Sequence, residues 1–88
     1  MEEKKIEEET YSLTNTIRLP RLVGKGYVDV NTELALKQTP QRVYNGIKRE
    51  QLRLVGDYTS KEVTFKVERG FVKSFEIKDI PKVKEIKI

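Results

Sequence analysis

Three arginines carry the most suggestive chemistry in this sequence: Arg42, Arg49 and Arg53, all within residues 39–56. If this segment is helical, at about 100° per residue, the three fall on one stripe with Asn45 beside it. An apolar stripe lies roughly 120° round the same helix and contains Val43, Ile47 and Leu54. Guanidinium groups donate hydrogen bonds to phosphate oxygens in a planar fork. A helix with one apolar and one arginine stripe therefore favours nucleic-acid binding.

Several other chemistries are excluded by composition, because the chain contains no His and no Cys. Zinc sites in most arrangements need one of these two residues, and disulfides need Cys. Acid–base catalysis through His and nucleophilic catalysis by Cys are excluded in the same way. We therefore expect no enzyme, no cofactor and no metal site, and an enzyme built on carboxylates or lysine ranks last among the alternatives.

Charge is distributed unevenly along the chain. The 88 residues carry a net charge of +4, and charged residues make up 36% of them. Residues 1–9 contain five Glu and two Lys, so the remaining segment is considerably more basic than the whole. A basic body behind an acidic lead-in suits a polyanionic partner. The alternative is a set of charges that only solvates the surface.

The domain organisation follows from length and hydropathy. Residues 1–9 predict an acidic flexible arm, and residues 10–88 predict a single domain. The N-terminal residues lack the apolar region of a signal peptide. The longest apolar run is the three residues 34–36, too short for a membrane-spanning helix. These observations predict a cytoplasmic protein with no membrane partner, whose oligomeric state is left open.

Strands are predicted in the first third of the chain. Apolar residues at alternate positions indicate a half-buried strand over 10–19, with Pro20 ending it or placing it at a sheet edge. Gly24-Lys25-Gly26 predicts a hairpin connection into a short strand at 27–30. An anion-binding nest is the less favoured interpretation of those glycines.

Two helices are predicted next. Asn31 or Thr32 caps a helix over 32–38, and Thr39 caps a second helix that starts at Pro40. The second helix is expected to span 40–51, because the alternation around Arg53 indicates a strand at 52–55. Gly46 in mid-helix indicates either a close contact or a weak helix.

A hairpin is predicted over residues 62–78, after a turn at 56–60. A two-residue loop at Arg69-Gly70 would put polar residues on the apolar face, so we expect a three-residue loop, 68–70, with a bulge. This register gives strands 62–67 and 71–77 with Lys73 as a misfit, and its apolar face comprises Val63, Phe65, Val67, Phe71, Phe75 and Ile77. The tail, residues 81–88, is an edge strand or a loose end.

Together these patterns predict the α+β class: a small single domain of antiparallel β-hairpins packed on one or two short helices. The hairpin's apolar face has no other large surface to cover, so we expect Val43, Ile47, Phe65 and Phe75 to be buried together. On that basis Phe75→Ala would cost about 3–5 kcal/mol.

Residues 32–56 resemble a helix-turn-helix followed by a wing, as in MerR-type and excisionase-type DNA-binding domains. The resemblance rests on a short helix containing Ala35, the Thr39 cap, inward-facing residues near Val43 and Ile47, and the step from 48–52 into a strand. It implies that the helix from Pro40 enters the major groove. The residues it assigns to base edges are Gln41, Arg42 and Asn45, and those it assigns to phosphates or the neighbouring backbone are Lys48, Arg49, Arg53, Tyr58 and Lys61.

The sequence thus predicts a small, basic, non-enzymatic nucleic-acid-binding protein, with duplex DNA favoured as partner. The main alternative is a protein-interaction module of viral or mobile-element origin, binding through a sheet edge or the acidic arm. A sheet-surface RNA-binding module is disfavoured, because it needs exposed aromatic residues on strands. Phe65, Phe71 and Phe75 are all predicted on the core face.

Overall fold

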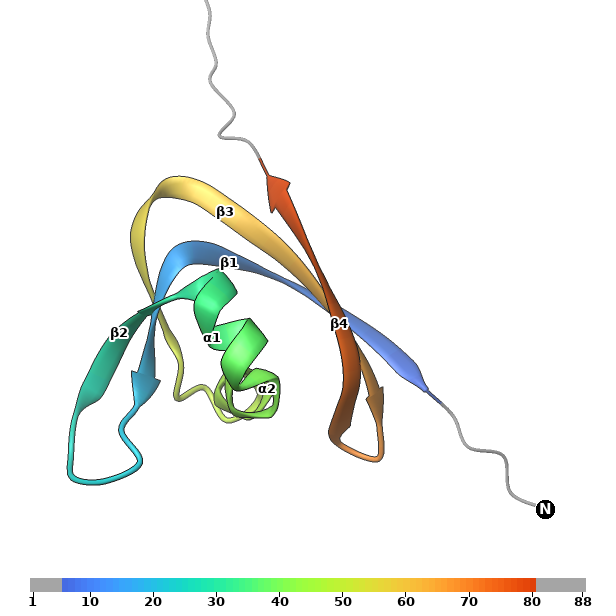
Figure 1. Ribbon diagram of the computed structural model, residues 1–88, viewed down its shortest axis with the longest axis horizontal. Coiled ribbons are helices and arrows are strands. Elements are labelled where there is room, and N and C mark those ends of the chain that lie inside the picture. The colour runs from blue at the N-terminus through green and yellow to red at the C-terminus, as the bar shows by residue number, and fades with distance from the viewer. Residues whose placement is uncertain (1–5, 81–88) are drawn as a thin grey trace, which may run out of the picture.

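The computed structural model describes residues 6–80, except for the side chains of residues 57–59; the predicted tail lies outside the described residues. Its elements, in chain order, are β1 (Glu7–Pro20), β2 (Tyr27–Asn31), α1 (Thr32–Gln38), α2 (Pro40–Lys48), β3 (Arg53–Glu68) and β4 (Phe71–Ile80). The strands form one antiparallel sheet of order β2-β1-β3-β4, which arches over the two short helices (Figure 1). The predicted α+β class is therefore wrong, because the structure is mainly β.

The centre of the sheet is the long ladder between β1 and β3. It runs antiparallel from Glu7 opposite Val67 to Arg18 opposite Arg53. The alternation predicted for residues 10–19 is present, since Leu13, Ile17 and Leu19 are buried. The strand nevertheless begins three residues earlier than predicted, so residues 7–9 of the expected acidic arm belong to the sheet. Backbone pairing with β3 stabilises this acidic segment despite its low hydrophobicity.

The predicted turn at 56–60 is wrong, because β3 continues through it as one strand. The irregular composition instead produces a break in register: Thr14 pairs with Ser60, whereas Thr16 pairs with Val55. Gly56 has a φ of 127° at this point. The Thr14 hydroxyl donates to the Val55 carbonyl at 2.7 Å, and this hydrogen bond links β1 and β3 at the break in register. Extra residues on one strand increase the local bend, and the sheet curls.

Helix α2 ends at Lys48, three residues before the predicted end. Glu50 has a φ of 59°, and its N–H donates to the Ile47 carbonyl at 3.2 Å while that of Gln51 donates to the Gly46 carbonyl at 2.8 Å. This is the Schellman arrangement, which satisfies the last carbonyls of a helix. Glutamate occupies the left-handed position usually taken by glycine, so no glycine marks the end of this helix in the sequence.

The helix starts are partly as predicted. Asn31 caps α1, with its side chain accepting a hydrogen bond from the Leu34 N–H at 3.1 Å. Pro40 opens α2, but the Thr39 side chain makes no cap for it. The Thr39 hydroxyl donates instead to the Ala35 carbonyl at 3.0 Å. In this rotamer the hydroxyl is directed at the preceding helix and makes no hydrogen bond with the first N–H groups of α2.

The β3–β4 hairpin has the two-residue turn at Arg69-Gly70 that the sequence analysis rejected. Both turn residues have positive φ, 56° and 84°, as a type I′ turn requires. The predicted bulge lies inside β4 instead: Val67 pairs with Val72, but Lys66 pairs with Ser74. Lys73 is thereby the extra residue. The bulge places Val72 against the core and leaves Phe71 exposed, so the predicted inward position of Phe71 is wrong.

The core lies between the concave face of the sheet and the helices. Phe65 and Val43 are fully buried in it, while Ile47 and Phe75 are partly buried against it. Tyr44 packs on Phe65 edge to face, with ring centroids 5.3 Å apart. Gly46 allows α2 to lie close to Leu52, because a Cβ at position 46 would be 3.1 Å from the Leu52 Cβ. The close contact predicted for Gly46 is thus present.

Candidate functional site

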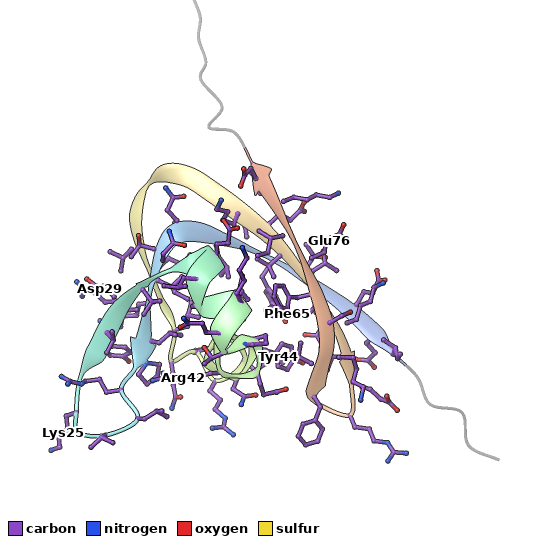
Figure 2. The ribbon with its side chains drawn as sticks, in the orientation of Figure 1. Lys25, Asp29, Arg42, Tyr44, Phe65 and Glu76 are labelled. Carbon is purple, nitrogen blue, oxygen red and sulfur yellow. The ribbon has the colours of Figure 1, made fainter. Side chains whose placement is uncertain are left out.

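A cavity of about 190 Å³ opens between α2 and the end of β1. Three of the residues around it are arginines, and among the described residues that line it none is acidic. The described residues that line it are Pro20, Arg21, Leu22, Arg42, Asn45, Gly46, Arg49 and Gln51. We call this cavity the arginine pocket. Figure 2 shows Arg42 beside α2, on the side of the β1–β2 hairpin.

Arg42 has an unusual environment within the arginine pocket. The residue is half-buried, whereas an arginine on a helix stripe that contacts a nucleic acid is expected to be exposed. In the described part of the chain, its Nη2 is the buried side-chain nitrogen that has no hydrogen-bond partner. A buried donor without a partner costs about 1–3 kcal/mol, more when it is charged. Arg42 thus lines the pocket with a guanidinium group whose Nη2 is buried and unsatisfied, so an anion in the pocket reaches that atom only if the side chain turns.

The pocket is positioned by the two ends of α2 and by the turn after β1. Val43 and Tyr44 fix the rotation of α2, because both are buried against the sheet. Arg42 and Arg49 are seven residues apart, so they lie on the same side of the helix axis. Arg21 follows the last residue of β1, and its N–H donates to the Gly26 carbonyl at 3.2 Å. The hairpin closure thus brings Arg21 to the helix.

The structure brings together Arg42, Asn45 and Arg49 of the predicted binding residues. It adds Arg21 and Gln51, which the sequence analysis missed. Arg21 lies about twenty residues before the helix in sequence, and only the hairpin geometry reveals that it faces α2. Gln51 was expected inside the helix, and the early end of α2 changes its position.

Gln41, predicted at a base edge, is occupied inside the molecule. Its amide nitrogen donates to the Gly70 carbonyl at 2.9 Å and to Asn45 Oδ1 at 3.1 Å. Its amide oxygen accepts from the Val72 N–H at 2.7 Å. Gln41 therefore fastens α2 to the β3–β4 hairpin and has little capacity left for a ligand.

The other predicted binding residues lie away from the arginine pocket. Arg53 pairs with Arg18 in the sheet and lies over the Tyr27 ring, with Cζ 5.2 Å from the centroid. Because Ile17 and Leu19, the neighbours of Arg18, are buried, Arg18 and Arg53 share the outer face of the sheet. For Tyr58 the backbone belongs to β3, and its side chain lies outside the described residues.

Both predicted lysines make ion pairs. Lys61 contacts Asp79 at 2.6 Å and Glu33 at 3.8 Å, and the hydrogen bond to Asp79 raises the pKa of Lys61 above its ordinary value. Lys48 contacts Glu9 at 3.3 Å. These pairs connect α1 and α2 with the strands, so the two lysines contribute contacts within the domain.

Glu9 is the centre of a second polar cluster, on the opposite side of α2. It accepts hydrogen bonds from the Tyr11 hydroxyl at 2.6 Å and from the Tyr44 hydroxyl at 3.1 Å. The Tyr11 hydrogen bond, with those from Tyr44 and Lys48, holds the pKa of Glu9 below its ordinary value, although burial opposes this. Burial, followed by the hydrogen bond to Glu9, raises the pKa of Tyr11 to about 12, and the same causes raise the pKa of Tyr44.

Glu9→Gln should lower the pKa of both Tyr11 and Tyr44, because the glutamine lacks the charge that disfavours tyrosinate. Tyrosine pKa values raised in the folded state contribute stability below pH 10 that is lost as the pH rises towards about 12. The variant should therefore lose less stability between pH 10 and 12. Tyrosinate absorbance during alkaline titration measures the shift, with Tyr11→Phe to assign it. Glu8→Gln, on the outer face, is the control. Equal tyrosine titration curves for the wild-type, Glu9→Gln and Glu8→Gln proteins would contradict the cluster.

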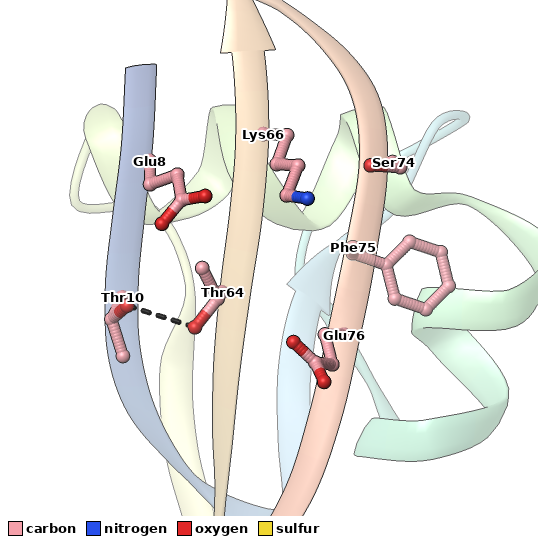
Figure 3. A pocket seen from close by; sticks show the side chains of 7 residues that line it. All are labelled: Glu8, Thr10, Thr64, Lys66, Ser74, Phe75 and Glu76. Carbon is pink, nitrogen blue, oxygen red and sulfur yellow. Dashed lines mark hydrogen bonds between the residues drawn. The ribbon is translucent and has the colours of Figure 1, made fainter. Parts of the chain in front are cut away.

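The outer face of the sheet carries a larger cavity of about 460 Å³ (Figure 3). Its charged residues are of both signs: Glu8 and Glu76 flank Lys66. The Thr10 and Thr64 hydroxyls are hydrogen-bonded to each other at 2.8 Å across the strands. With two carboxylates and one ammonium, this cavity is unsuited to a polyanion, in contrast to the arginine pocket.

No protein-family model, curated protein or solved structure matches the chain. Within residues 6–80, no group of three or more acidic residues could hold a metal ion. Neither of the helices described there has the length and apolar character needed to cross a membrane. The arginine pocket is therefore the basis on which a function can be argued.

Proposed function

We propose that this protein is a small non-enzymatic nucleic-acid-binding protein that holds a backbone phosphate in the arginine pocket. The observation that carries the proposal is the gathering of Arg21, Arg42 and Arg49 around one cavity that no carboxylate of the described residues lines. Like charges brought together cost free energy unless an anion compensates them. A phosphate group supplies both the negative charge and the acceptor oxygens.

The unpartnered Nη2 of Arg42 supports the same conclusion, because a turn of this buried side chain towards the pocket would exchange an unsatisfied donor for one bonded to phosphate. Guanidinium–phosphate hydrogen bonds are charge-assisted and are about twice as strong as those between neutral groups. The pocket volume, about 190 Å³, greatly exceeds the about 10–15 Å³ that one water molecule needs. It therefore has room for a phosphate group and its ester oxygens.

The predicted binding residues have different roles in this proposal. Arg42 and Arg49 contact phosphate, with Arg21 as a third contact, and Asn45 is next to them at the pocket wall. The resemblance of residues 32–56 to a helix-turn-helix makes duplex DNA the favoured partner, with α2 as the element nearest to it. Since Gln41 is bonded to the β3–β4 hairpin, base reading is not proposed for it.

Binding to a short duplex should weaken steeply with salt, because each phosphate contact releases counterions. The slope of log K against log salt changes by about 0.9 for each contact. Arg42→Gln, Arg49→Gln and Arg21→Gln should each flatten the slope by roughly one unit. Fluorescence anisotropy over a salt series measures this. Arg49 is exposed, so Arg49→Gln should change the free energy of unfolding by no more than about 0.5 kcal/mol.

Lys66→Gln is the matched control, since it removes one positive charge from the outer face, next to Glu8 and Glu76. It should leave the slope within experimental error. Equal flattening by Lys66→Gln and Arg49→Gln would show that only net charge matters and would remove the pocket from the proposal. If the protein binds neither DNA nor RNA at low salt, the protein-interaction alternative replaces the proposal.

A further inference from the structure

The loop between β1 and β2, residues 21–26, exposes two consecutive large aliphatic side chains. Leu22 is 83% exposed and Val23 is 82% exposed, the highest values among the large hydrophobic residues that the structure describes. Lys25 lies in the same loop, at the end of the hairpin (Figure 2). Isolated exposed apolar residues are common on protein surfaces, but an adjacent pair at a loop tip calls for a partner that covers it.

The base of this loop is well fixed. Pro20 pairs with Tyr27 at the end of the ladder, and the Arg21 N–H donates to the Gly26 carbonyl at 3.2 Å. The Arg18–Asp29 ion pair, at 2.6 Å, joins the two strands two residues further from the loop. At Gly24, an added Cβ would meet nothing within 4 Å. The tip therefore projects from a braced hairpin and stands clear of the rest of the domain.

The apolar tip is continuous with the arginine pocket. Leu22 lines the pocket together with Arg21, Arg42 and Arg49, and Lys25 adds a further cation to the loop. Residues 20–26 contain no acidic residue. A ligand seated on this surface must offer an anionic group beside a flat apolar one. Nucleic acids do so, because each backbone phosphate is covalently linked to a base whose faces are apolar.

An anionic membrane also combines negative charge with apolar material, but the geometry favours a nucleic acid. Surface-bound membrane segments bury the apolar face of a whole amphipathic helix, whereas here the apolar surface is two short side chains. Leucine is among the apolar side chains that minor-groove-binding proteins insert between base steps. The pocket also provides enclosed contacts for one phosphate rather than a broad charged plane.

We infer that the 21–26 loop inserts Leu22 and Val23 against the bases of the nucleic acid whose phosphate occupies the arginine pocket, unstacking one base step. This binding mode rests on the proposed function. The arginine pocket holds the sugar–phosphate backbone of the nucleic acid, and the loop separates two of its stacked bases. Flexible steps, such as TA and CA, are the ones easiest to unstack, so the protein should prefer them.

The test uses the full chain and short duplexes with 2-aminopurine at one position, whose fluorescence rises on unstacking. We expect the wild-type protein to raise the fluorescence at one step, most strongly at TA or CA. The double variant Leu22→Ser, Val23→Ser should lose most of that rise. Val23→Ser alone, at a residue outside the pocket lining, should lose part of it with an unchanged salt slope. Both residues are exposed, so thermal unfolding should be unaffected. Leu34→Ser is the control, because Leu34 is 49% exposed on α1 and should leave the rise intact.

Three results would overturn the inference. If the double variant keeps the fluorescence rise while its binding remains salt-dependent, Leu22 and Val23 do not unstack the bases, and the proposed function stands. If the wild-type protein shows no salt-dependent binding, the proposed function fails and the inference fails with it. If the wild-type protein sediments with phosphatidylserine vesicles and the double variant does not, the loop belongs to a lipid surface.

Discussion

Phe65→Ala should destabilise the domain by about 3–5 kcal/mol, most of the stability expected of a domain this small. Phe65 is fully buried and lies near the end of β3, three residues before Glu68. Its ring contacts those of Tyr44 and Tyr11, at centroid distances of 5.3 and 6.2 Å. Truncation removes both aromatic contacts and leaves a cavity in the core between the sheet and α2.

Urea unfolding followed by circular dichroism measures this effect, and the other two phenylalanines provide the scale. Phe75, which the sequence analysis singled out for the large cost, is only partly buried, so Phe75→Ala should cost less than Phe65→Ala. Phe71 is 66% exposed, and Phe71→Ala should cost less than about 1 kcal/mol. Any other order of the three costs would mean that the β3–β4 register is wrong.

Gly56→Val should cost about 1–3 kcal/mol from backbone strain alone. Gly56 has a φ of 127°, and a Cβ there would lie 3.5 Å from the Thr16 backbone nitrogen. A β-branched side chain cannot adopt this φ, so either the bend in β3 relaxes or the strain remains. Thermal unfolding measures the loss of stability.

Ser74→Val is the matched control for Gly56→Val, since Ser74 is an exposed residue of β4 and valine is favoured in strands. It should change the melting temperature little. If Gly56→Val is equally harmless, the bend in β3 does not depend on glycine at that position.

The sequence predicted local periodicity well and continuity poorly. The alternation of Leu13, Ile17 and Leu19 identified the buried face of β1, because a half-buried strand has a period of two. The glycine and polar residues at 56–60 are as typical of a turn as of an irregular strand, because both structures need a residue that can adopt a positive φ. Pairing with β1 decided between them, and such long-range pairing is not visible in local sequence.

The candidate site was predictable only in part for the same reason. Helical spacing correctly placed Arg42 and Arg49 on one side of α2. It could not show that the helix stops at Lys48, because the left-handed residue there is Glu50 rather than glycine. Arg53 was counted in the helical arginine stripe although the same sequence predicted a strand at 52–55, and it lies on the outer face of the sheet, opposite Arg18. Arg21 joins the site through the fold of the β1–β2 hairpin.

The central ladder also has a consequence for how the chain reaches this fold. β1 pairs with β3, and β2, α1 and α2 all lie in the chain segment between them. That whole segment must be closed into a loop before the first central pair forms, at an entropic cost that short-range contacts do not carry. The β1–β2 and β3–β4 hairpins need only short loops. Assembly therefore depends on the meeting of two locally formed hairpins, and domains dominated by such distant pairing fold in milliseconds to seconds.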